Sequence, residues 1–306
     1  MRVAAIDVGS NTVKLIVADS VGDGVFQPVL ETAATTRLGE GIHAKRLREA
    51  AIRRTLDALR SFVATCRDHG VERLAAVGTS ALRDAANRQE FVERARALGV
   101  EVEPIAGEEE ARLSFQAVRR DPRWSGAASV MVVDIGGGST EIVWEETAAG
   151  GSLRWMSLPL GGVRLTEAAL RSDPPTILQM AEANETAERA LQVFRPHAPN
   201  LMAVGVGGTV VNLAAVRHGV ADRDPERLHG VRLTSDDIEA QIGMFGGMTV
   251  AERQTVPGLD PARADIILGG AIILSQVLHV AGIDAIDVSC RGLRWGVLYD
   301  RFGSTR

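Results

Sequence analysis

The 306-residue chain has no apolar run of the ~18 residues that a membrane-spanning helix needs. Its first residues, Met1 to Ala4, lead directly into a predicted strand, so we expect no signal peptide. It has only two cysteines, Cys66 and Cys290, and their spacing matches no metal-binding or redox motif. We therefore expect reduced thiols, a cytoplasmic protein and no membrane partner.

Lysine is also scarce, because Lys14 and Lys45 are the only two and the other basic residues are arginines. The net charge of −5 argues against a nucleic-acid partner, which would require an excess of basic residues. The hydrophobic content of 45% is that of an ordinary globular protein. At roughly 150 residues per domain, the length predicts two domains.

A glycine-rich signature occurs twice, 127 positions apart. The first copy is Asp-Val-Gly-Ser-Asn-Thr at residues 7–12, and the second is Asp-Ile-Gly-Gly-Gly-Ser-Thr at residues 134–140. Aligned without a gap, the two aspartates coincide, the first glycines coincide and Thr12 matches Ser139. Apolar runs flank both copies. Each copy therefore predicts a strand, a tight glycine turn and a second strand.

The chemistry of this turn suits phosphate. Glycine has no Cβ and lets the backbone approach an anion closely, and successive N–H groups in such a turn form an anion-binding concavity. We predict phosphate contacts from the turn residues, which are Gly9, Ser10, Asn11, Thr12, Gly136, Gly137, Gly138 and Ser139. Two such hairpins facing each other across a cleft would clamp polyphosphate groups. The alternative is a pair of ordinary hairpins.

Charged residues beside the two turns divide into two roles. An aspartate at a strand end would repel phosphate, so we expect it to hold a hydrated Mg²⁺ or to position a water molecule. Lys14 follows the first turn, and Glu141 occupies the matching position after the second. We therefore assign Lys14 to phosphate, and Asp134 with Glu141 to a metal ion.

The ends of two further predicted strands give weaker indications of phosphate binding. The predicted strand 73–77 leads through small residues to Arg83, which would bind an anion or lie exposed at a capped helix. The strand 201–206 ends in Gly207, Gly208 and Thr209, a third glycine-rich turn that offers backbone donors to phosphate. We also predict long helices over residues 44–69 and 176–194, within an α/β pattern throughout.

Three glutamates, Glu108 to Glu110, open a predicted helix after a strand and a glycine. They would complement the helix dipole, or one would orient or deprotonate a water molecule. Consecutive helical residues point ~100° apart, so at most one or two of the three can face a cleft. Residues 121–127 are the predicted junction between domains 1–125 and 126–306.

Several segments together carry a family resemblance. The two Asp-x-Gly hairpins and the Gly-Gly-Thr turn resemble the actin, sugar-kinase and Hsp70 ATPase fold. Six segments in order resemble the exopolyphosphatase and guanosine pentaphosphate phosphohydrolase family over nearly the whole chain. They are residues 7–12, 78–83 (Gly-Thr-Ser-Ala-Leu-Arg), 107–113 (Gly-Glu-Glu-Glu-Ala-Arg-Leu), 134–141, 160–165 (Leu-Gly-Gly-Val-Arg-Leu) and 291–299 (Arg-Gly-Leu-Arg-Trp-Gly-Val-Leu-Tyr).

The resemblance implies an α/β fold of two actin-like (ribonuclease H-like) domains with a cleft between them. It implies that Glu110 is the general base, that Arg83 contacts phosphate, and that Asp134 and Glu141 bind Mg²⁺ or Mn²⁺. The implied activity is metal-dependent hydrolysis of the terminal phosphate of inorganic polyphosphate. Larger family members carry an additional C-terminal helical domain, so this chain resembles the short form, and we expect short polyphosphate chains as substrates.

Other functions stay open at this point. Guanosine pentaphosphate is the alternative substrate, and a sensor that binds guanosine tetraphosphate is the alternative to an enzyme. A small-molecule kinase of the same fold and a chaperone-type ATPase are less favoured, because no adenosine-pocket signature beyond residues 207–209 and no peptide-binding domain are present. The oligomeric state is open, a homodimer included.

Overall fold

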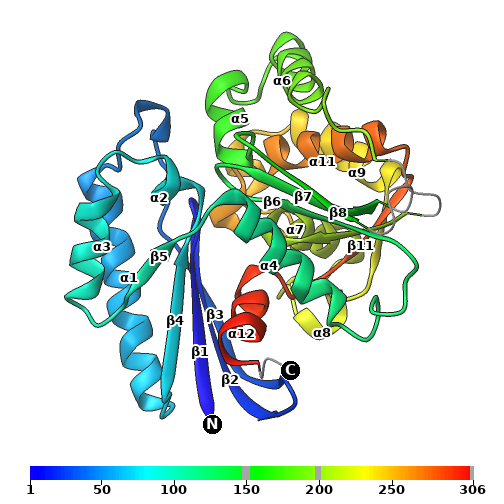
Figure 1. Cartoon of the computed structure of the whole chain (residues 1–306). Coiled ribbons are helices and arrows are strands. Elements are labelled where there is room, and N and C mark those ends of the chain that lie inside the picture. Colours follow the sequence, from blue (N-terminus) through cyan, green and yellow to red (C-terminus); the bar gives the residue numbers. More distant parts are fainter. Residues whose placement is uncertain (147–151, 197–200, 304–306) are drawn as a thin grey trace. The chain divides into compact units, whose positions relative to one another are not determined.

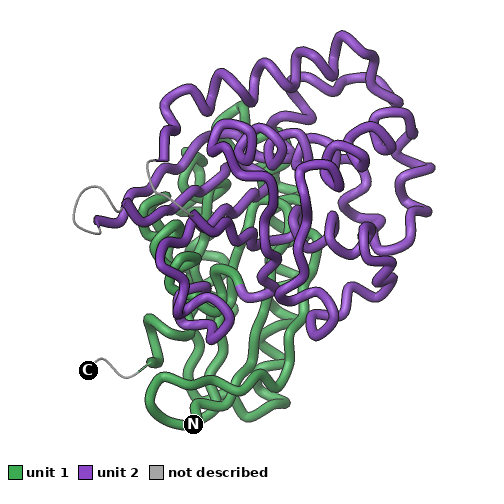
Figure 2. The backbone as a smooth tube through the Cα atoms, turned by 90° about the vertical axis from the view of Figure 1, so that its right-hand side faces the viewer, with its two compact units in different colours: residues 1–117, 292–306 green, residues 118–291 purple. Residues whose placement is uncertain are grey.

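The computed structural model of the protein describes residues 1–146, 152–196 and 201–303, with helices and strands throughout (Figure 1). The chain divides into two compact units, coloured separately in Figure 2: residues 1–117 together with those from 292 onward, and residues 118–291. The α/β class is as predicted. The units differ from the expected domains 1–125 and 126–306, chiefly because the chain returns to unit 1 at residue 292.

Unit 1 is built on a five-stranded sheet of order β3-β2-β1-β4-β5. Its strands are β1 (Arg2–Val8), β2 (Thr12–Gly22), β3 (Val25–Thr35), β4 (Arg73–Gly78) and β5 (Val102–Pro104). The first three strands form an antiparallel meander, and β4 and β5 extend the sheet in parallel with β1. The ends of β1 and β4 therefore meet at one edge of the sheet, where the first glycine loop lies.

Helices cover both faces of this sheet. On one face, Ala4, Ile6 and Val8 pack in a core with α1 (Glu49–Asp68), α2 (Ser80–Asp84) and α3 (Arg88–Arg96). On the other face, Val3 and Ala5 pack against α4 (Gly107–Arg119) and α12 (Leu293–Phe302). Alternate residues of a strand point to opposite faces, so Asp7 points to the same face as Val3 and Ala5.

Unit 2 repeats this plan with one extra strand, in the order β10-β11-β9-β6-β7-β8. Its strands are β6 (Val130–Ile135), β7 (Thr140–Glu146), β8 (Ser152–Leu158), β9 (Met202–Val206), β10 (Arg232–Thr234) and β11 (Ala285–Val288). The strands β6 and β7 are antiparallel, and β9 is parallel to β6, as β1, β2 and β4 are in unit 1. The sequence repeat is therefore also a repeat of topology.

One hydrophobic core joins the unit 2 sheet to its helices. Met131, Val133 and Ile135 on β6 belong to a cluster that includes Leu228 of the short helix α8 (Pro225–Leu228) and residues of five longer helices. These helices are α5 (Gly162–Ala169), α6 (Ile177–Ala190), α7 (Gly207–His218), α9 (Ser235–Gly246) and α11 (Ile267–Ala281). The short helices α8 (Pro225–Leu228) and α10 (Val250–Arg253) complete the unit.

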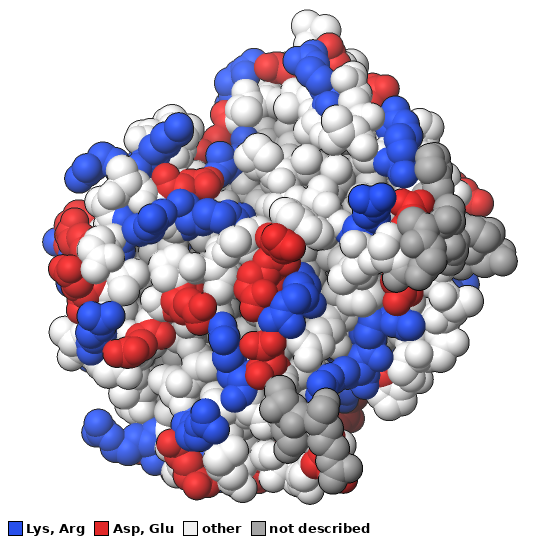
Figure 3. Space-filling model, in the orientation of Figure 1, with Lys and Arg blue, Asp and Glu red and all other residues white. Residues whose placement is uncertain are grey.

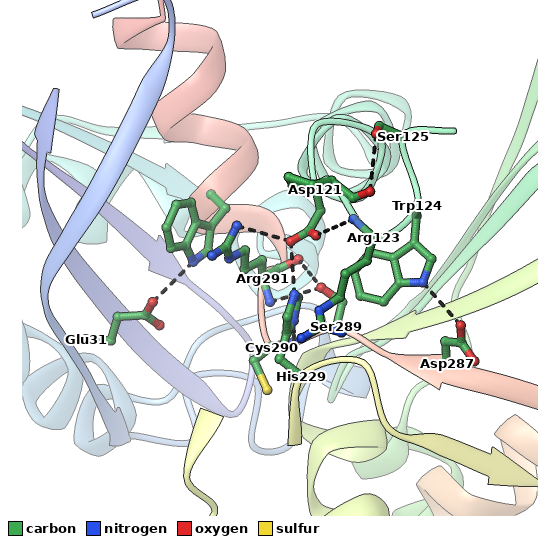
Figure 4. Close-up of polar contacts among 12 residues, drawn as sticks. Glu31, Asp121, Arg123, Trp124, Ser125, His229, Asp287, Ser289, Cys290 and Arg291 are labelled. Atoms are coloured by element: carbon green, nitrogen blue, oxygen red, sulfur yellow. Dashed lines mark hydrogen bonds and ion pairs between the residues drawn. The ribbon is translucent and has the colours of Figure 1, made fainter. Parts of the chain in front are cut away.

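A buried aspartate connects the two borders of unit 2 (Figure 4). Asp121 is 2% exposed, and its Oδ2 accepts hydrogen bonds from His229 Nε2 at 3.0 Å and Arg291 Nη1 at 3.1 Å. Its Oδ1 accepts a bond from Arg123 N at 3.0 Å. His229 Nδ1 accepts a bond from Cys290 N at 3.2 Å, so the ring proton is on Nε2.

The surface and the helices agree with the composition. Among the described residues, no helix combines the length and the apolar character that crossing a membrane requires. On the face drawn in Figure 3, acidic and basic side chains are interspersed rather than gathered by sign. That face therefore offers no broad basic area of the kind that binds nucleic acid.

Candidate active site

The first glycine loop, residues 9–12, connects β1 to β2 and is closed by a hydrogen bond from Gly9 N to Thr12 O at 3.2 Å. The carbonyls of Ser10 and Asn11 accept bonds from backbone N–H groups in the segment 36–39. A peptide group is planar and trans, so its N–H points away from its C=O. The N–H groups of Asn11 and Thr12 therefore point to the opposite side of the loop, as in an anion-binding turn.

The strand-end aspartate of unit 1 is buried beside two cations. Asp7 is 5% exposed, is paired with Lys14 in the strand register, and has its Oδ2 3.7 Å from Lys14 Nζ. Burial raises the pKa of Asp7 above its usual value, although Lys14 and Arg294 act in the opposite direction. In the described part of the chain, Asp7 Oδ1 has no hydrogen-bond partner. It is thus a carboxylate oxygen able to accept a bond from water or a hydrated cation.

Only one of the three consecutive glutamates is buried. Glu110 is 7% exposed, Glu108 is exposed and Glu109 is half-buried. Arg83 Nη1 lies 2.9 Å from Glu110 Oε2 and also donates to Ile105 O at 3.3 Å. The helix α4 therefore aims one carboxylate inward, as its 3.6-residue period predicts, and α2 supplies a cation to it. This ion pair was not predicted from the sequence.

The second glycine loop, residues 136–139, has the same closure as the first, with a bond from Gly136 N to Ser139 O at 2.9 Å. Asp134 and Glu141 are paired in the strand register, as Asp7 and Lys14 are in unit 1. Glu141 is 1% exposed, and its Oε1 accepts a bond from Ser157 Oγ at 2.8 Å. Lys14 and Glu141, which align in sequence, therefore occupy the same position in their respective hairpins.

The third glycine turn lies beside the second loop. Gly207 has a left-handed φ of +85°, and a Cβ there would lie 2.5 Å from Asp134 Oδ1. A Cβ on Gly208 would lie 2.2 Å from the guanidinium carbon of Arg263. Thr209 Oγ1 donates to Ile135 O at 3.0 Å and so fixes the turn to the end of β6. Glycines here permit the backbone to pass close to a carboxylate and a guanidinium.

Arg263 is a residue of this region that the sequence analysis did not assign to phosphate. Burial lowers the pKa of its guanidinium, and the carboxylates of Asp260 and Asp134 raise it in opposition. An arginine remains charged under all ordinary conditions, so this is a cation placed near Asp134 and the third turn. The only sequence signal was an arginine shortly before the apolar helix α11.

The carboxylates of unit 2 fit a hard divalent cation. In the described residues, no group of three or more His, Cys, Asp or Glu side chains is arranged to hold a metal ion. Asp134 and Glu141 instead form a pair of oxygen donors on adjacent strands. Mg²⁺ is usually held by one or two carboxylates together with waters and substrate phosphates, rather than by an all-protein cage. The donor set is thus suited to Mg²⁺ or Mn²⁺.

Comparison with protein families adds an independent result to this geometry. Residues 16–305 match the model of the Ppx/GppA phosphatase family. The chain belongs to the Ppx/GppA phosphatase family. It is 36% identical over 305 residues to exopolyphosphatase 2 of Mycobacterium tuberculosis, covering 94% of each chain. It is 32% identical over 314 residues to exopolyphosphatase 1 of the same organism, covering 99% of this chain and 89% of the relative.

Solved Ppx/GppA structures share the fold over nearly the whole chain. The crystal structure of the Aquifex aeolicus family member superimposes with a TM-score of 0.81 at 36% identity, covering 98% of this chain and 97% of the other. An exopolyphosphatase from Cytophaga hutchinsonii superimposes with a TM-score of 0.85 at 28% identity, with the same coverage. The fold predicted from the two Asp-x-Gly hairpins is confirmed.

The predicted site residues of this Ppx/GppA protein form two groups, one in each unit. Unit 1 holds the first loop with Lys14, Arg83 and Glu110. Unit 2 holds the second loop and the third turn with Asp134 and Glu141. Within each unit the local pairings, Arg83 with Glu110 and Asp134 with Glu141, bring segments from different elements together.

Proposed function

We propose that this Ppx/GppA protein is an exopolyphosphatase that hydrolyses the terminal phosphoanhydride of inorganic polyphosphate, with short chains preferred. The names of its mycobacterial relatives support the substrate class. The observation that carries the proposal is the ion pair between the buried Glu110 and the partly buried Arg83. In this proposal Glu110 is the proton acceptor and Arg83 the cation that binds phosphate, and burying a carboxylate is costly unless it is paired.

Phosphate groups are bound, in this proposal, by backbone N–H groups of the two glycine loops and the third turn. Hydroxyl and amide side chains of the loops add donors, and Lys14, Arg83 and Arg263 add positive charge. The full set is Gly9, Ser10, Asn11, Thr12, Lys14, Arg83, Gly136, Gly137, Gly138, Ser139, Gly207, Gly208, Thr209 and, from the structure, Arg263. Arginine suits this task because its planar fork matches phosphate oxygens.

Glu110 acts as the general base. It accepts a proton from a water molecule whose oxygen attacks the terminal phosphorus in line with the bridging oxygen. The phosphorus–oxygen anhydride bond breaks, and the shortened polyphosphate leaves with the bridging oxygen. Arg83 exchanges part of its bonding to Glu110 for bonding to phosphate, which leaves the carboxylate able to take the proton. One such base contributes about 10²–10⁴-fold to the rate.

In the proposed enzyme, Asp134 and Glu141 would hold Mg²⁺ or Mn²⁺. The cation would offset the negative charge of the phosphate groups and the charge that develops in the transition state. Ser157 keeps the Glu141 carboxylate oriented through its hydroxyl. Positioning and electrostatic stabilisation supply the part of the rate enhancement that the base does not.

Replacement of the base tests the assignment directly. Glu110→Gln keeps the size of the side chain and an acceptor for Arg83 but cannot take a proton. We expect kcat for phosphate release from short polyphosphate to fall about 10²–10⁴-fold with KM little changed. Glu109→Gln is the matched control, because Glu109 is bonded to Arg112 on the outer side of α4. Equal turnover in wild type and Glu110→Gln excludes this role.

Guanosine pentaphosphate is a second candidate substrate, since the matched family includes GppA as well as Ppx phosphatases. Its terminal 5′ phosphoanhydride presents the same chemistry to Glu110 and the glycine loops. Phosphate release from short polyphosphate, long polyphosphate and guanosine pentaphosphate should be measured side by side at equal phosphate concentration. The highest kcat/KM identifies the preferred substrate.

A further inference from the structure

The second glycine loop is held from behind by the N-terminus of α5. The carbonyls of residues 136–138 accept hydrogen bonds from residues 162–164 at the start of that helix. The bonds run from Gly162 N to Gly136 O (2.9 Å), from Val163 N to Gly137 O (2.9 Å) and from Arg164 Nε to Gly138 O (2.6 Å). Three consecutive carbonyls are thus anchored to one element.

This anchoring determines where the loop directs its N–H groups. Each C=O shares a planar trans peptide with the N–H of the next residue, which points the opposite way. The N–H groups of residues 137–139 therefore all point away from α5. Within the described residues, none of these three N–H groups donates a hydrogen bond. Consecutive N–H groups turned to one side are the geometry that binds a phosphate oxygen.

Gly161 allows this close approach. A Cβ at this position would lie 2.5 Å from Gly137 O and 2.7 Å from Gly138 N, both of them backbone atoms. The φ of Gly161 is −142°, which any residue adopts, so glycine is required here for space alone. The start of α5 would otherwise be an anion site in its own right, but its N–H groups are already bonded to the loop.

The first loop is anchored in the same way by an unrelated segment. The carbonyls of Ser10 and Asn11 accept bonds from the segment 36–39, and a Cβ on Gly39 would lie 2.9 Å from Ser10 Cβ. The two loops have matching sequences, and a different segment binds the carbonyls of each. In both loops the N–H groups are turned to the opposite side. The recurrence indicates that orienting the loop carbonyls is a requirement of the site.

We propose that the N-terminus of α5 is the template that sets the second loop in its phosphate-binding shape, with Gly161 and Arg164 as positioning residues. The inference rests on the proposed function of the loop. Arg164 acts through Gly138 and is not itself required to touch the substrate. Its contribution is a loop ordered before phosphate arrives, which lowers the entropic cost of binding.

The test compares Arg164→Met, Arg164→Lys and Gly161→Ala with wild type. Gly243→Ala is the matched control, because it is a glycine of unit 2 with open space around its Cβ position. We expect Arg164→Met to raise KM for short polyphosphate about tenfold, the order expected for one lost charge-assisted hydrogen bond, with kcat less affected. Arg164→Lys should recover part of this loss. Gly161→Ala should lower kcat/KM about 100-fold, since a displaced loop misaligns the phosphate.

Hydrogen exchange in the substrate-free protein separates positioning from direct contact. Arg164→Met should speed exchange in a peptide containing residues 161–164, whose Gly162 and Val163 N–H groups donate to the loop carbonyls, and leave the rest of unit 2 and the melting temperature unchanged. A residue that contacted only the substrate would raise KM without altering this exchange, which would overturn the inference. Faster exchange throughout unit 2 would indicate a general loss of stability and would also overturn it.

Failure of the proposed function and failure of the α5 template give different experimental results. A wild-type protein that releases no phosphate from any polyphosphate refutes the proposed function, and the exchange measurement still decides whether α5 orders the loop. Normal phosphate release with unchanged KM and exchange in Arg164→Met refutes the template alone. Gly161→Ala that is unfolded by circular dichroism is set aside, and the two Arg164 variants decide the question.

Discussion

The Glu110 carboxylate and the Arg83 guanidinium depend on each other in the proposed chemistry. The two side chains are 9% and 24% exposed, so each removes much of the other's access to water. Removing one partner leaves the other charge poorly compensated, whereas Glu110→Gln leaves a neutral acceptor in place. The pair therefore has a structural role as well as a catalytic one, and the two roles can be separated by substitution.

Arg83→Met tests both roles. We expect kcat/KM for polyphosphate to fall about 10²–10³-fold, as for loss of one preorganised donor to the transition state. The free energy of unfolding should fall by about 1–3 kcal/mol, because the carboxylate stays buried without its cation. Steady-state kinetics and urea unfolding measure the two effects. Arg83→Lys keeps the charge and should retain more of both, and wild-type kcat/KM in Arg83→Met would contradict the assignment.

Gly207→Ala examines the contact between the third turn and Asp134. A methyl group there meets Asp134 Oδ1 and also forces a left-handed φ on alanine, so we expect a loss of about 1–3 kcal/mol in unfolding free energy. Mn²⁺ binding, measured by electron paramagnetic resonance, should weaken because the carboxylate is displaced.

Gly219→Ala supplies the control for backbone strain. Gly219 also has a left-handed φ, of +64°, but open space around its Cβ position. It should cost stability and leave Mn²⁺ binding unchanged. Equal Mn²⁺ affinity in Gly207→Ala and wild type would argue against Asp134 as a metal ligand.

At the scale of elements, the C-terminal motif is explained by the packing of α12 in unit 1. Trp295 Nε1 donates to Glu31 at 3.2 Å, and Arg294 forms an ion pair with the same carboxylate at 2.5 Å. Both residues thus tie α12 to β3. A Cβ on Gly296 would lie 2.0 Å from Leu113 O on α4, so this glycine permits the two helices to touch.

Gly296→Ala should therefore destabilise unit 1. We expect a loss of about 2–3 kcal/mol, typical of overpacking a buried contact, and a lower melting temperature in calorimetry. Gly243→Ala, a helical glycine with free space, should be neutral or slightly stabilising because alanine favours helix. An unchanged melting temperature in Gly296→Ala would show that the helices separate at no cost.

Sequence patterns located most elements but not all of their ends. The helix expected over residues 44–69 begins at Glu49, because residues 42–44 form a separate 3₁₀ turn and Lys45 has a left-handed φ of 53°. The expected start of α6 agrees closely, since Thr176 forms a capping box with Gln179. The glycines 269 and 270 pack against α5 and Thr209. Local capping chemistry is readable from sequence, whereas backbone strain is not.

At the scale of the molecule, Asp121 ties together the segments through which the chain enters and leaves unit 2 (Figure 4). Burial by itself would raise the pKa of Asp121, but His229, the Arg123 N–H and Arg291 together lower it below its usual value. A lowered carboxyl pKa in the folded state adds stability above the usual aspartate value. That stability is lost as the pH falls through the folded value.

We therefore expect the unfolding free energy to be constant near neutral pH and to decrease below about pH 4. Asp121→Asn should be less stable at neutral pH by about 1–3 kcal/mol, because Arg291 and His229 lose the negative charge of this carboxylate, and should show a weaker decrease in acid. Urea unfolding from pH 7 to pH 3 measures both curves. Parallel curves for the two proteins would show that Asp121 does not contribute.

Sequence alone determined the two glycine hairpins, the α/β class and the candidate residues. Glycine turns and the alternation of apolar residues in strands depend on neighbouring positions, so a short stretch of sequence is enough to predict them. The tertiary structure decided which glutamate of three is buried, that Arg83 pairs with it, that Arg263 lies over Gly208, and that the chain returns to unit 1 at residue 292. These features depend on packing between segments that are distant in the chain. Residues of the same type, such as the three glutamates, are equivalent in the sequence and differ only in what packs around them.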